Sequence, residues 1–280
     1  MPASTRRSPC LGWGLVATTI PVVSRNLAIW VAFDGTDFHG WQRQPGLRTV
    51  QQVLEETLQR AIRHPVDLTA CGRTDSGVHA AAHVSNFRTD CNLPVDKLLH
   101  SFGSHLPDDI GILAVRDVAA HFHATRSAIA KCYRYRIHAS QRRPVASLTQ
   151  RFTHHQWVPL DVDAMRAAAR HFIGEHDFTS LAATGTRRET MVRSVFRCDV
   201  ERHLDEIHVN VEGDGFLWKQ VRAMVGTLIQ VGVGHWPADD VAAIIAARDR
   251  SRAGPTMPAK GLCLQWVRYP PEVLATADRT

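Results

Sequence analysis

The sequence predicts an α+β protein made of two ferredoxin-like units, each with the order β-α-β-β-α-β, related by a pseudo-twofold axis. Two observations support this prediction. The first half of the chain alternates short apolar runs with amphipathic stretches in that order, and the second half repeats the order. We expect mixed or antiparallel sheets with a central cleft between them.

The first half contains the elements of one unit. Residues 27–33 are apolar and predict a buried strand, which ends at the turn signal Asp34-Gly35. Thr49 has capping-box spacing with Gln52, and apolar residues recur after it at helical spacing. The other expected elements of this half are a strand at 66–71, a strand at 82–87, a helix at about 95–105 and a strand at 110–115.

The second half repeats this order. Tyr133, Tyr135 and Ile137 alternate along 131–138 and predict a strand that carries all three side chains on one face. Apolar residues within 217–229 form a strong helical stripe. The remaining expectations are a helix at 161–173, a hairpin of 195–201 and 206–212, a short helix at about 238–248, a last strand at 262–267, and loops at 140–152 and 181–191.

Three segments follow from this reading: an N-terminal extension at 1–25, a first α+β unit at 26–120 and a second at 121–280. The extension has basic residues before a mildly apolar run, so a signal peptide is one alternative. Glycines, hydroxyl residues and Pro21 weaken that run. A disordered extension, or a start codon placed upstream, fits better.

The net charge of +6 over 280 residues suggests a polyanionic partner. Arg6, Arg7 and Arg25 supply three of these charges, and no acidic residue lies in 1–25, so the rest of the chain carries only +3 (6 minus 3). Nucleic acid is therefore a plausible partner that charge alone does not establish.

The six cysteines are scattered and include no CxxC pair. This spacing is typical of a reduced cytosolic protein and indicates neither a disulfide framework nor a zinc site. No apolar run reaches the roughly 18 residues that a membrane-spanning helix needs.

The stretch TACGRTDSGVHAAAH, residues 69–83, holds one carboxylate, Asp75, between two glycines. An Asp in such a loop is most simply a turn residue. However, about ten residues separate the flanking strands, and Arg73 lies two positions earlier, where a cation favours the ionised carboxylate. Loops on a rigid sheet often carry chemistry, so Asp75 is a candidate nucleophile or base.

CGRTDSGVHA closely resembles the signature of the TruA family of tRNA pseudouridine synthases, in which the Asp is catalytic. The resemblance extends from residue 27 to 270 and keeps the family's order of motifs. The further matching blocks are FDGTDFHGWQRQP (33–45), FHATRSAIAKCYRYRI (122–137), GEHDFTSL (174–181), GFLWKQVRAMVGTLIQVG (215–232) and PAKGLCLQWVRYP (258–270).

The resemblance implies a role for each of five residues. Asp75 would be the essential carboxylate, either attacking C1′ of the ribose or removing the C2′ proton. Arg73 would fill the space left by a flipped base or contact a neighbouring phosphate, and Arg222 would pair with Asp75. Tyr133 would stack on the target base, and Leu262 would pack against the uracil. From the residues alone, Tyr133 and Leu262 are equally well explained as core side chains, and Arg222 as a surface arginine.

The resemblance also implies the reaction and its setting: isomerisation of uridines 38, 39 and 40 in the anticodon stem-loop of tRNA. The enzyme would be a cytoplasmic homodimer that uses no cofactor and no metal. The chain departs from the family pattern at Thr125, where an arginine is common, and at Lys219 and Gln220, where Asn or His followed by Met is common. These departures affect RNA contacts more than the chemistry.

Rival functions have weaker support. His79 and His83 have the i, i+4 spacing of HExxH zinc enzymes, but Ala80 stands in place of the Glu and the pair enters a strand. A non-catalytic RNA-binding module is the more serious alternative, because ferredoxin-like sheets also bind RNA. A glycosidase needs a second carboxylate, and GVGHWP at 232–237 is not a dinucleotide-binding fingerprint because it lacks GxGxxG and follows a helix.

Overall fold

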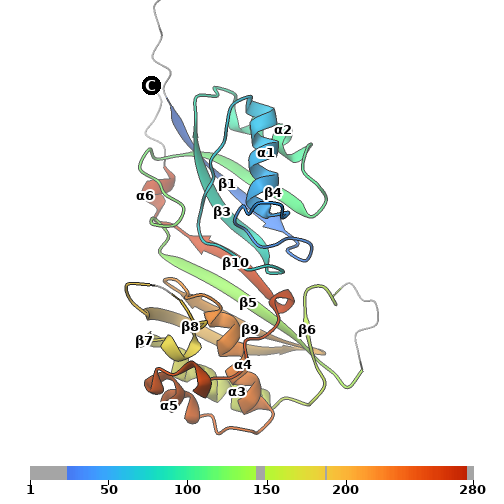
Figure 1. The fold of residues 1–280 in the computed structure, drawn as a ribbon, viewed down its shortest axis with the longest axis vertical. Coiled ribbons are helices and arrows are strands. Elements are labelled where there is room, and N and C mark those ends of the chain that lie inside the picture. The colour runs from blue at the N-terminus through green and yellow to red at the C-terminus, as the bar shows by residue number, and fades with distance from the viewer. Residues whose placement is uncertain (1–23, 143–148, 187, 276–280) are drawn as a thin grey trace, which may run out of the picture.

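The computed structural model describes residues 24–142, 149–186 and 188–275 and shows a mixed α+β fold around one sheet (Figure 1). Its strands are β1 (Arg25–Phe33), β2 (Thr69–Ala70), β3 (His79–Thr89), β4 (Ile110–Val118), β5 (Ala130–Ala139), β6 (His154–Gln156), β7 (Gly174–Asp177), β8 (Val192–His203), β9 (Glu206–Gly213) and β10 (Leu262–Arg268). Its α-helices are α1 (Val50–Ile62), α2 (Val95–Gly103), α3 (Val162–Ala169), α4 (Gln220–Gly232), α5 (Asp240–Ala247) and α6 (Pro271–Leu274).

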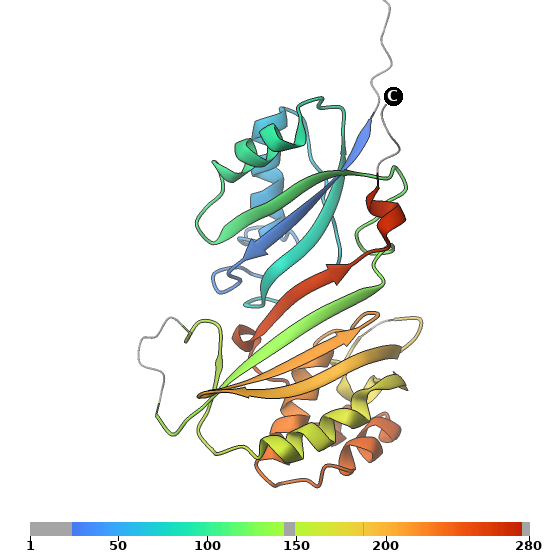
Figure 2. The ribbon, with the colours of Figure 1, turned by 180° about the vertical axis from the view of Figure 1, so that it is seen from behind.

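The expectation of separate sheets is wrong, because the strands form one ten-stranded sheet in the order β4-β1-β3-β10-β5-β9-β8-β7, with β2 on β3 and β6 on β5. The last strand joins the two halves. β10 pairs in parallel with β3, where Cys263 lies opposite His79, and antiparallel with β5, where Leu264 lies opposite Tyr133. Seen from behind, β10 and β5 run side by side between the halves (Figure 2).

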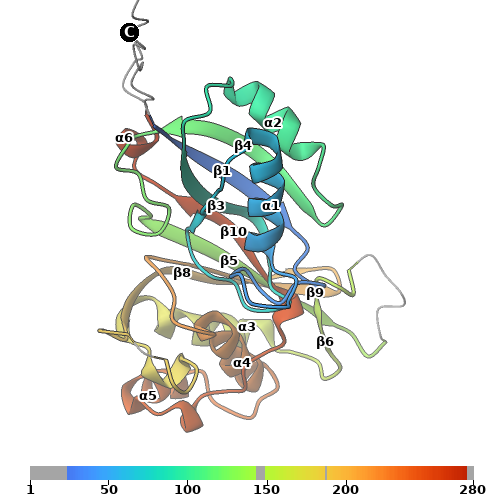
Figure 3. The ribbon, with the colours of Figure 1, turned by 45° about the horizontal axis from the view of Figure 1, so that its top comes forward.

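The first half follows the predicted order, but some of its strands and helices are shorter or longer than predicted. Thr49 caps α1 by accepting from the backbone N–H of Gln52, as its spacing predicts. α1 lies over the strands of this half (Figure 3). The expected strand at 66–71 is reduced to the two residues of β2, because the Leu68 N–H donates to the Glu55 carboxylate (3.1 Å) and not to a neighbouring strand.

The second half also differs at two helix boundaries. The expected helix at 161–173 is α3, capped by Asp161, followed by a 3₁₀ turn at Arg170–Phe172. The stripe that starts at Leu217 becomes helical only at Gln220, because Lys219 adopts a left-handed backbone conformation (φ 60°) that no α-helix continues through. This break turns the residues before α4 toward the loop that carries Asp75.

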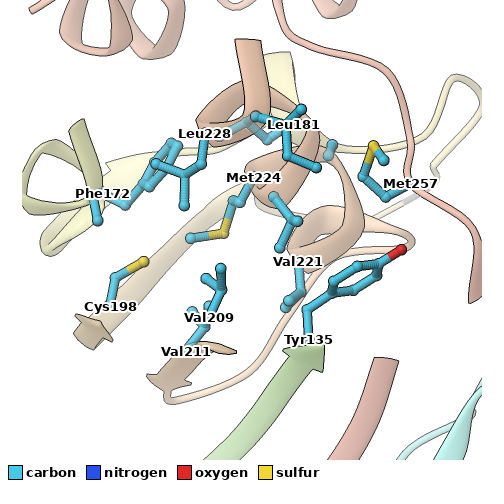
Figure 4. Packing of buried hydrophobic residues seen from close by; sticks show 14 of the residues in the cluster. Tyr135, Phe172, Leu181, Cys198, Val209, Val211, Val221, Met224, Leu228 and Met257 are labelled. Carbon is cyan, nitrogen blue, oxygen red and sulfur yellow. The ribbon is translucent and has the colours of Figure 1, made fainter. Parts of the chain in front are cut away.

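Each half has its own apolar core, and a few residues tie the cores together. In the second-half core, Met224 of α4 packs among side chains of the strands and of neighbouring helices (Figure 4). Val78 belongs to this core although it lies in the first half, whereas Leu264 belongs to the first-half core. Tyr133 packs against both. The junction between the halves is therefore a fixed part of the fold.

In the described part of the chain, every helix is too short or too polar to cross a membrane. The expected extension at 1–25 lies almost wholly outside the described residues, as does 143–148 of the expected loop at 140–152.

Candidate active site

Asp75 lies on the loop of residues 71–78, here called the Asp75 loop, which connects β2 to β3. Backbone hydrogen bonds hold this loop against the segment before α1. The Trp41 N–H donates to the Thr74 carbonyl (3.1 Å), and the Gly77 N–H donates to the Phe38 carbonyl (3.4 Å), which also accepts from the Ser76 hydroxyl (3.1 Å). The loop is therefore positioned largely by main-chain contacts.

Two glycines of the 33–45 block allow this close packing. A Cβ at Gly35 would lie 2.0 Å from the Val78 carbonyl oxygen, and a Cβ at Gly40 would lie 2.7 Å from that of Thr74. Gly40 also has a positive φ (84°), which disfavours other residues. The resemblance found in this block thus has a physical basis, because its glycines let the backbone approach the Asp75 loop.

The Asp75 carboxylate receives one hydrogen bond on each oxygen, and both donors come from the second half of the chain. Oδ2 lies 2.8 Å from Nη1 of Arg222, and Oδ1 accepts from the indole N–H of Trp218 (3.0 Å). The side chain of Asp75 keeps a quarter of its surface exposed (25%). The predicted pairing of Asp75 with Arg222 is therefore present, and the carboxylate remains open to a ligand.

Arg222 is itself fixed. Its Nε donates to the Met257 carbonyl (2.6 Å), and the Met257 N–H donates back to the Arg222 carbonyl (3.2 Å). Its side chain is only 13% exposed. A guanidinium can hold a carbonyl and a carboxylate at once because it has several donors in one plane.

Asp75 opens onto a cavity of about 1280 Å³ between the two halves. Tyr133 and Leu262, the two predicted base contacts, both line it. Tyr133 meets the Phe216 ring edge to face, with centroids 5.4 Å apart. Burial raises the pKa of the Tyr133 phenol, and the charge of Asp75 adds to this, so the phenol is neutral at physiological pH. All five predicted site residues therefore meet in one cavity, with exposed Arg73 at its wall.

The lining is strongly basic although the chain is not. Among the described residues that line the cavity, Asp75 is the sole carboxylate, and five cations surround it: Arg73, Lys131, Arg188, Lys219 and Arg222. Positive charge is therefore concentrated around the Asp75 carboxylate, and such a concentration attracts polyanions.

The sequence reading missed Trp218 and Lys131. Lys131 donates to the Cys71 carbonyl at the start of the Asp75 loop (2.7 Å), and burial lowers its pKa. Its alternation with Tyr133 along the same strand places both side chains on one face, so this signal was available. Trp218 lies within the matching block 215–232, but no local pattern pointed from it to Asp75, 143 residues away.

The departures from the family pattern have local explanations. The Thr125 hydroxyl donates to the carbonyl of Ala70 in β2, close to the Asp75 loop. Lys219 supplies the backbone break before α4, and its ammonium lies 4.6 Å from the centre of the Trp218 ring. The Gln220 side chain accepts from the Leu217 N–H (2.8 Å).

The two histidines of the rejected zinc motif have structural roles. Nδ1 of His79 accepts from the Gly35 N–H (3.0 Å), and Nε2 of His83 donates to the Gly72 carbonyl (2.9 Å). Within 24–142, 149–186 and 188–275, no group of three or more His, Cys, Asp or Glu side chains is arranged to hold a metal.

Comparison with known proteins defines the class of this chain. A family model described as tRNA pseudouridine synthase matches residues 29–125 and 168–270. These segments include Arg73, Asp75, Arg222 and Leu262, whereas Tyr133 lies between them.

Curated relatives are similar over nearly the whole chain. The tRNA pseudouridine synthase A of Acetivibrio thermocellus is 41% identical over 245 residues, which cover 88% of this chain and 100% of that protein. The protein of the same name from Brevibacillus brevis is 44% identical over 246 residues, with 88% and 100% covered. The chain therefore belongs to the tRNA pseudouridine synthase family. Among solved structures, a Cbf5-Nop10-Gar1 complex matches with 10% identity and a TM-score of 0.36 over 85% of this chain and 57% of that one, a likeness too distant to inform the site.

Proposed function

We propose that the protein is a tRNA pseudouridine synthase that isomerises uridines in the anticodon arm, with Asp75 as the reactive group. The observation that carries this proposal is the Asp75 carboxylate, which is bound by Arg222 and partly exposed in a cavity whose other charged lining residues are cations. Family membership supplies the reaction.

In this reaction the bond between N1 of uracil and C1′ of the ribose breaks. The base turns, C5 bonds to C1′, the proton on C5 leaves and N1 gains one. Atoms and charge balance without an oxidant, a reductant or a second substrate, so this chemistry needs no cofactor. Asp75 either attacks C1′ or removes the C2′ proton, and the Arg222 guanidinium holds the carboxylate for either role through its 2.8 Å contact with Oδ2.

A uridine in a helical arm must leave its stack to reach Asp75, which costs a few kcal/mol. Arg73 is exposed beside Asp75 in the loop, so it is suited to fill the vacated space or to bind the adjacent phosphate. The flat Tyr133 ring would stack on the flipped base and let it turn. Leu262, which is 6% exposed, would supply an apolar contact to the uracil.

The RNA backbone would follow the cations of the cavity. Arg188 lies in the segment 181–191, whose glycine, threonine and arginine content suits an ordered contact with phosphates. Gly185, Thr186 and Arg188 of this segment line the cavity, which supports that role.

The wider setting of the proposal follows the family resemblance. We infer that 26–120 and 121–280 act as two ferredoxin-like units related by a pseudo-twofold axis, that the protein works in the cytoplasm, and that it forms a homodimer whose subunits together bind the tRNA. The strand orders β4-β1-β3-β2 and β10-β5-β9-β8 support the two-unit description, because each places a repeat of the same chain order in the same spatial order.

The direct test compares the wild type with Asp75→Asn on anticodon-arm tRNA, scoring both pseudouridine and RNA affinity. We expect the product-forming rate to fall at least about 10³-fold, because the amide is neither base nor nucleophile, with affinity nearly unchanged. Asp163→Asn, at an exposed aspartate of α3 (88% exposed), is the matched control and should behave as wild type.

Normal product from Asp75→Asn would contradict the role of Asp75. Absence of product from wild type on every tRNA, with RNA binding retained, would favour the non-catalytic RNA-binding module.

A further inference from the structure

Trp218 is placed unusually for a tryptophan. Half of its surface is exposed (50%), yet its indole N–H donates to Oδ1 of Asp75 at 3.0 Å. Its main chain is fixed, because its carbonyl accepts from the Ala183 N–H (2.9 Å) and the preceding Leu217 is buried. Core packing therefore does not account for the ring's position, whereas the hydrogen bond does.

The two donors to Asp75 are complementary. Arg222 binds Oδ2 and supplies the positive charge. With that contact alone the carboxylate plane could still turn about its Cβ–Cγ bond. A donor on Oδ1 removes this freedom, and because the indole is neutral it does so without a second positive charge on a group that must act as a nucleophile or base.

Both donors also belong to one rigid unit. Trp218 and Arg222 are four residues apart, just before and within the first turn of α4. The first half of the chain carries the carboxylate, but donors from the second half set the orientation of its plane. The second half also contributes Tyr133 to the cavity wall.

We propose that Trp218 is a positioning residue for Asp75, whose indole N–H orients the carboxylate toward the ribose. The inference rests on the proposed function, because orientation affects the rate only if Asp75 reacts. Reaction rates depend steeply on such alignment, so loss of the N–H should slow the chemical step and leave RNA affinity unchanged.

The test uses two replacements of Trp218 in the full chain. Trp218→Phe keeps a flat ring and removes the donor. Replacement by benzothienylalanine keeps the bicyclic shape and puts sulfur in place of the N–H. Trp157→Phe is the matched control, since Trp157 is exposed to the same fraction (50%) and stands just after β6.

Single-turnover rates at saturating anticodon-arm RNA and dissociation constants are measured separately. We expect both Trp218 variants to react roughly tenfold more slowly than wild type, with dissociation constants within about twofold and unfolding temperatures unchanged. The control should match wild type in every respect.

A wild-type rate in the benzothienylalanine variant would overturn the inference and leave the proposed function intact. A weaker affinity with an unchanged saturated rate would overturn it too, because it would mean that the ring acts as an RNA-stacking surface. A wild-type protein that forms no pseudouridine would instead overturn the proposed function, and the inference with it.

Discussion

The two walls of the cavity are built differently. The first-half wall, the Asp75 loop, is held by main-chain hydrogen bonds and by glycines that leave no room for a side chain. The second-half wall, at the start of α4, acts through side chains: Arg222 and Trp218 bind the carboxylate, and Lys219 adds charge. The backbone thus decides where the Asp75 carboxylate lies, and side chains of the other half decide how it is oriented.

The first-half wall should fail most severely when its close packing is lost. A methyl group at Gly35 would lie 2.0 Å from the backbone oxygen of Val78, so Gly35→Ala must displace the loop or the strand start. We expect a loss of roughly 3 kcal/mol or more in the free energy of unfolding, together with most activity. Urea unfolding measures the first, and Gly111→Ala is the control because a Cβ there meets nothing within 4 Å. Equal stability of the two variants would refute the backbone account of this wall.

The second-half wall should respond in rate and not in stability. Arg222→Lys keeps the charge, but one ammonium cannot take over both the Met257 carbonyl and the Asp75 carboxylate. We expect the saturated rate to fall roughly 100-fold with little change in RNA affinity. Arg268→Lys, at an ion pair with Glu212, serves as the control. If Arg222→Lys raised the dissociation constant and spared the rate, Arg222 would be an RNA contact and not a partner of Asp75.

A pH-dependent effect, gradual because it accumulates over several pH units, tests how the first-half wall is anchored. His83 donates to the Gly72 carbonyl in the Asp75 loop and stacks on Trp41 (3.7 Å between centroids), and burial lowers the pKa of His83 to about 3. Below pH 6.5 His83 becomes protonated in the unfolded chain but stays neutral in the folded chain. The free energy of unfolding should therefore fall by about 1.4 kcal/mol per pH unit between pH 6.5 and 3 on account of His83.

The comparison is with His83→Gln, whose amide is neutral at every pH in this range. Burial also lowers the pKa of His79, so the variant keeps part of the pH dependence of the free energy of unfolding. It should lose only the part that comes from one proton bound at His83. Identical slopes in wild type and variant would show that His83 is not held neutral.

The two walls also show what the sequence could and could not predict. The chain order of the longer strands and helices was predictable because apolar periodicity is local, as at 131–138 and 206–212, whereas the short β6, β7 and α6 were not predicted. The single sheet was not, since it depends on a short parallel contact of β10 with β3 between residues far apart in sequence. The sequence pattern also did not predict where the backbone leaves the helical conformation, as it does at Lys219 just before α4.

The candidate site divides in the same way. Asp75 stood out from its loop, but Arg222, Tyr133 and Leu262 depended on the family resemblance, because their residue types alone fit a surface or a core equally well. Trp218 lies in the matching block 215–232 but was missed, because the resemblance implied no role for it and no periodicity connects it with Asp75 across 143 residues.

The central claim is that the Asp75 carboxylate carries the chemistry whereas exposed cations of the cavity such as Arg188 capture the RNA, and one paired measurement tests it. Tritium release from tRNA carrying [5-³H]uridine reports the loss of the C5 proton, and is measured in single turnovers across RNA concentrations for Asp75→Asn and Arg188→Gln. The account predicts that Asp75→Asn abolishes the saturated rate at near-normal affinity. Arg188→Gln should keep the saturated rate, weaken affinity about three- to tenfold and lower the salt dependence of binding by about one charge. If both variants changed the same parameter, the division of roles between Asp75 and the cavity cations would be contradicted.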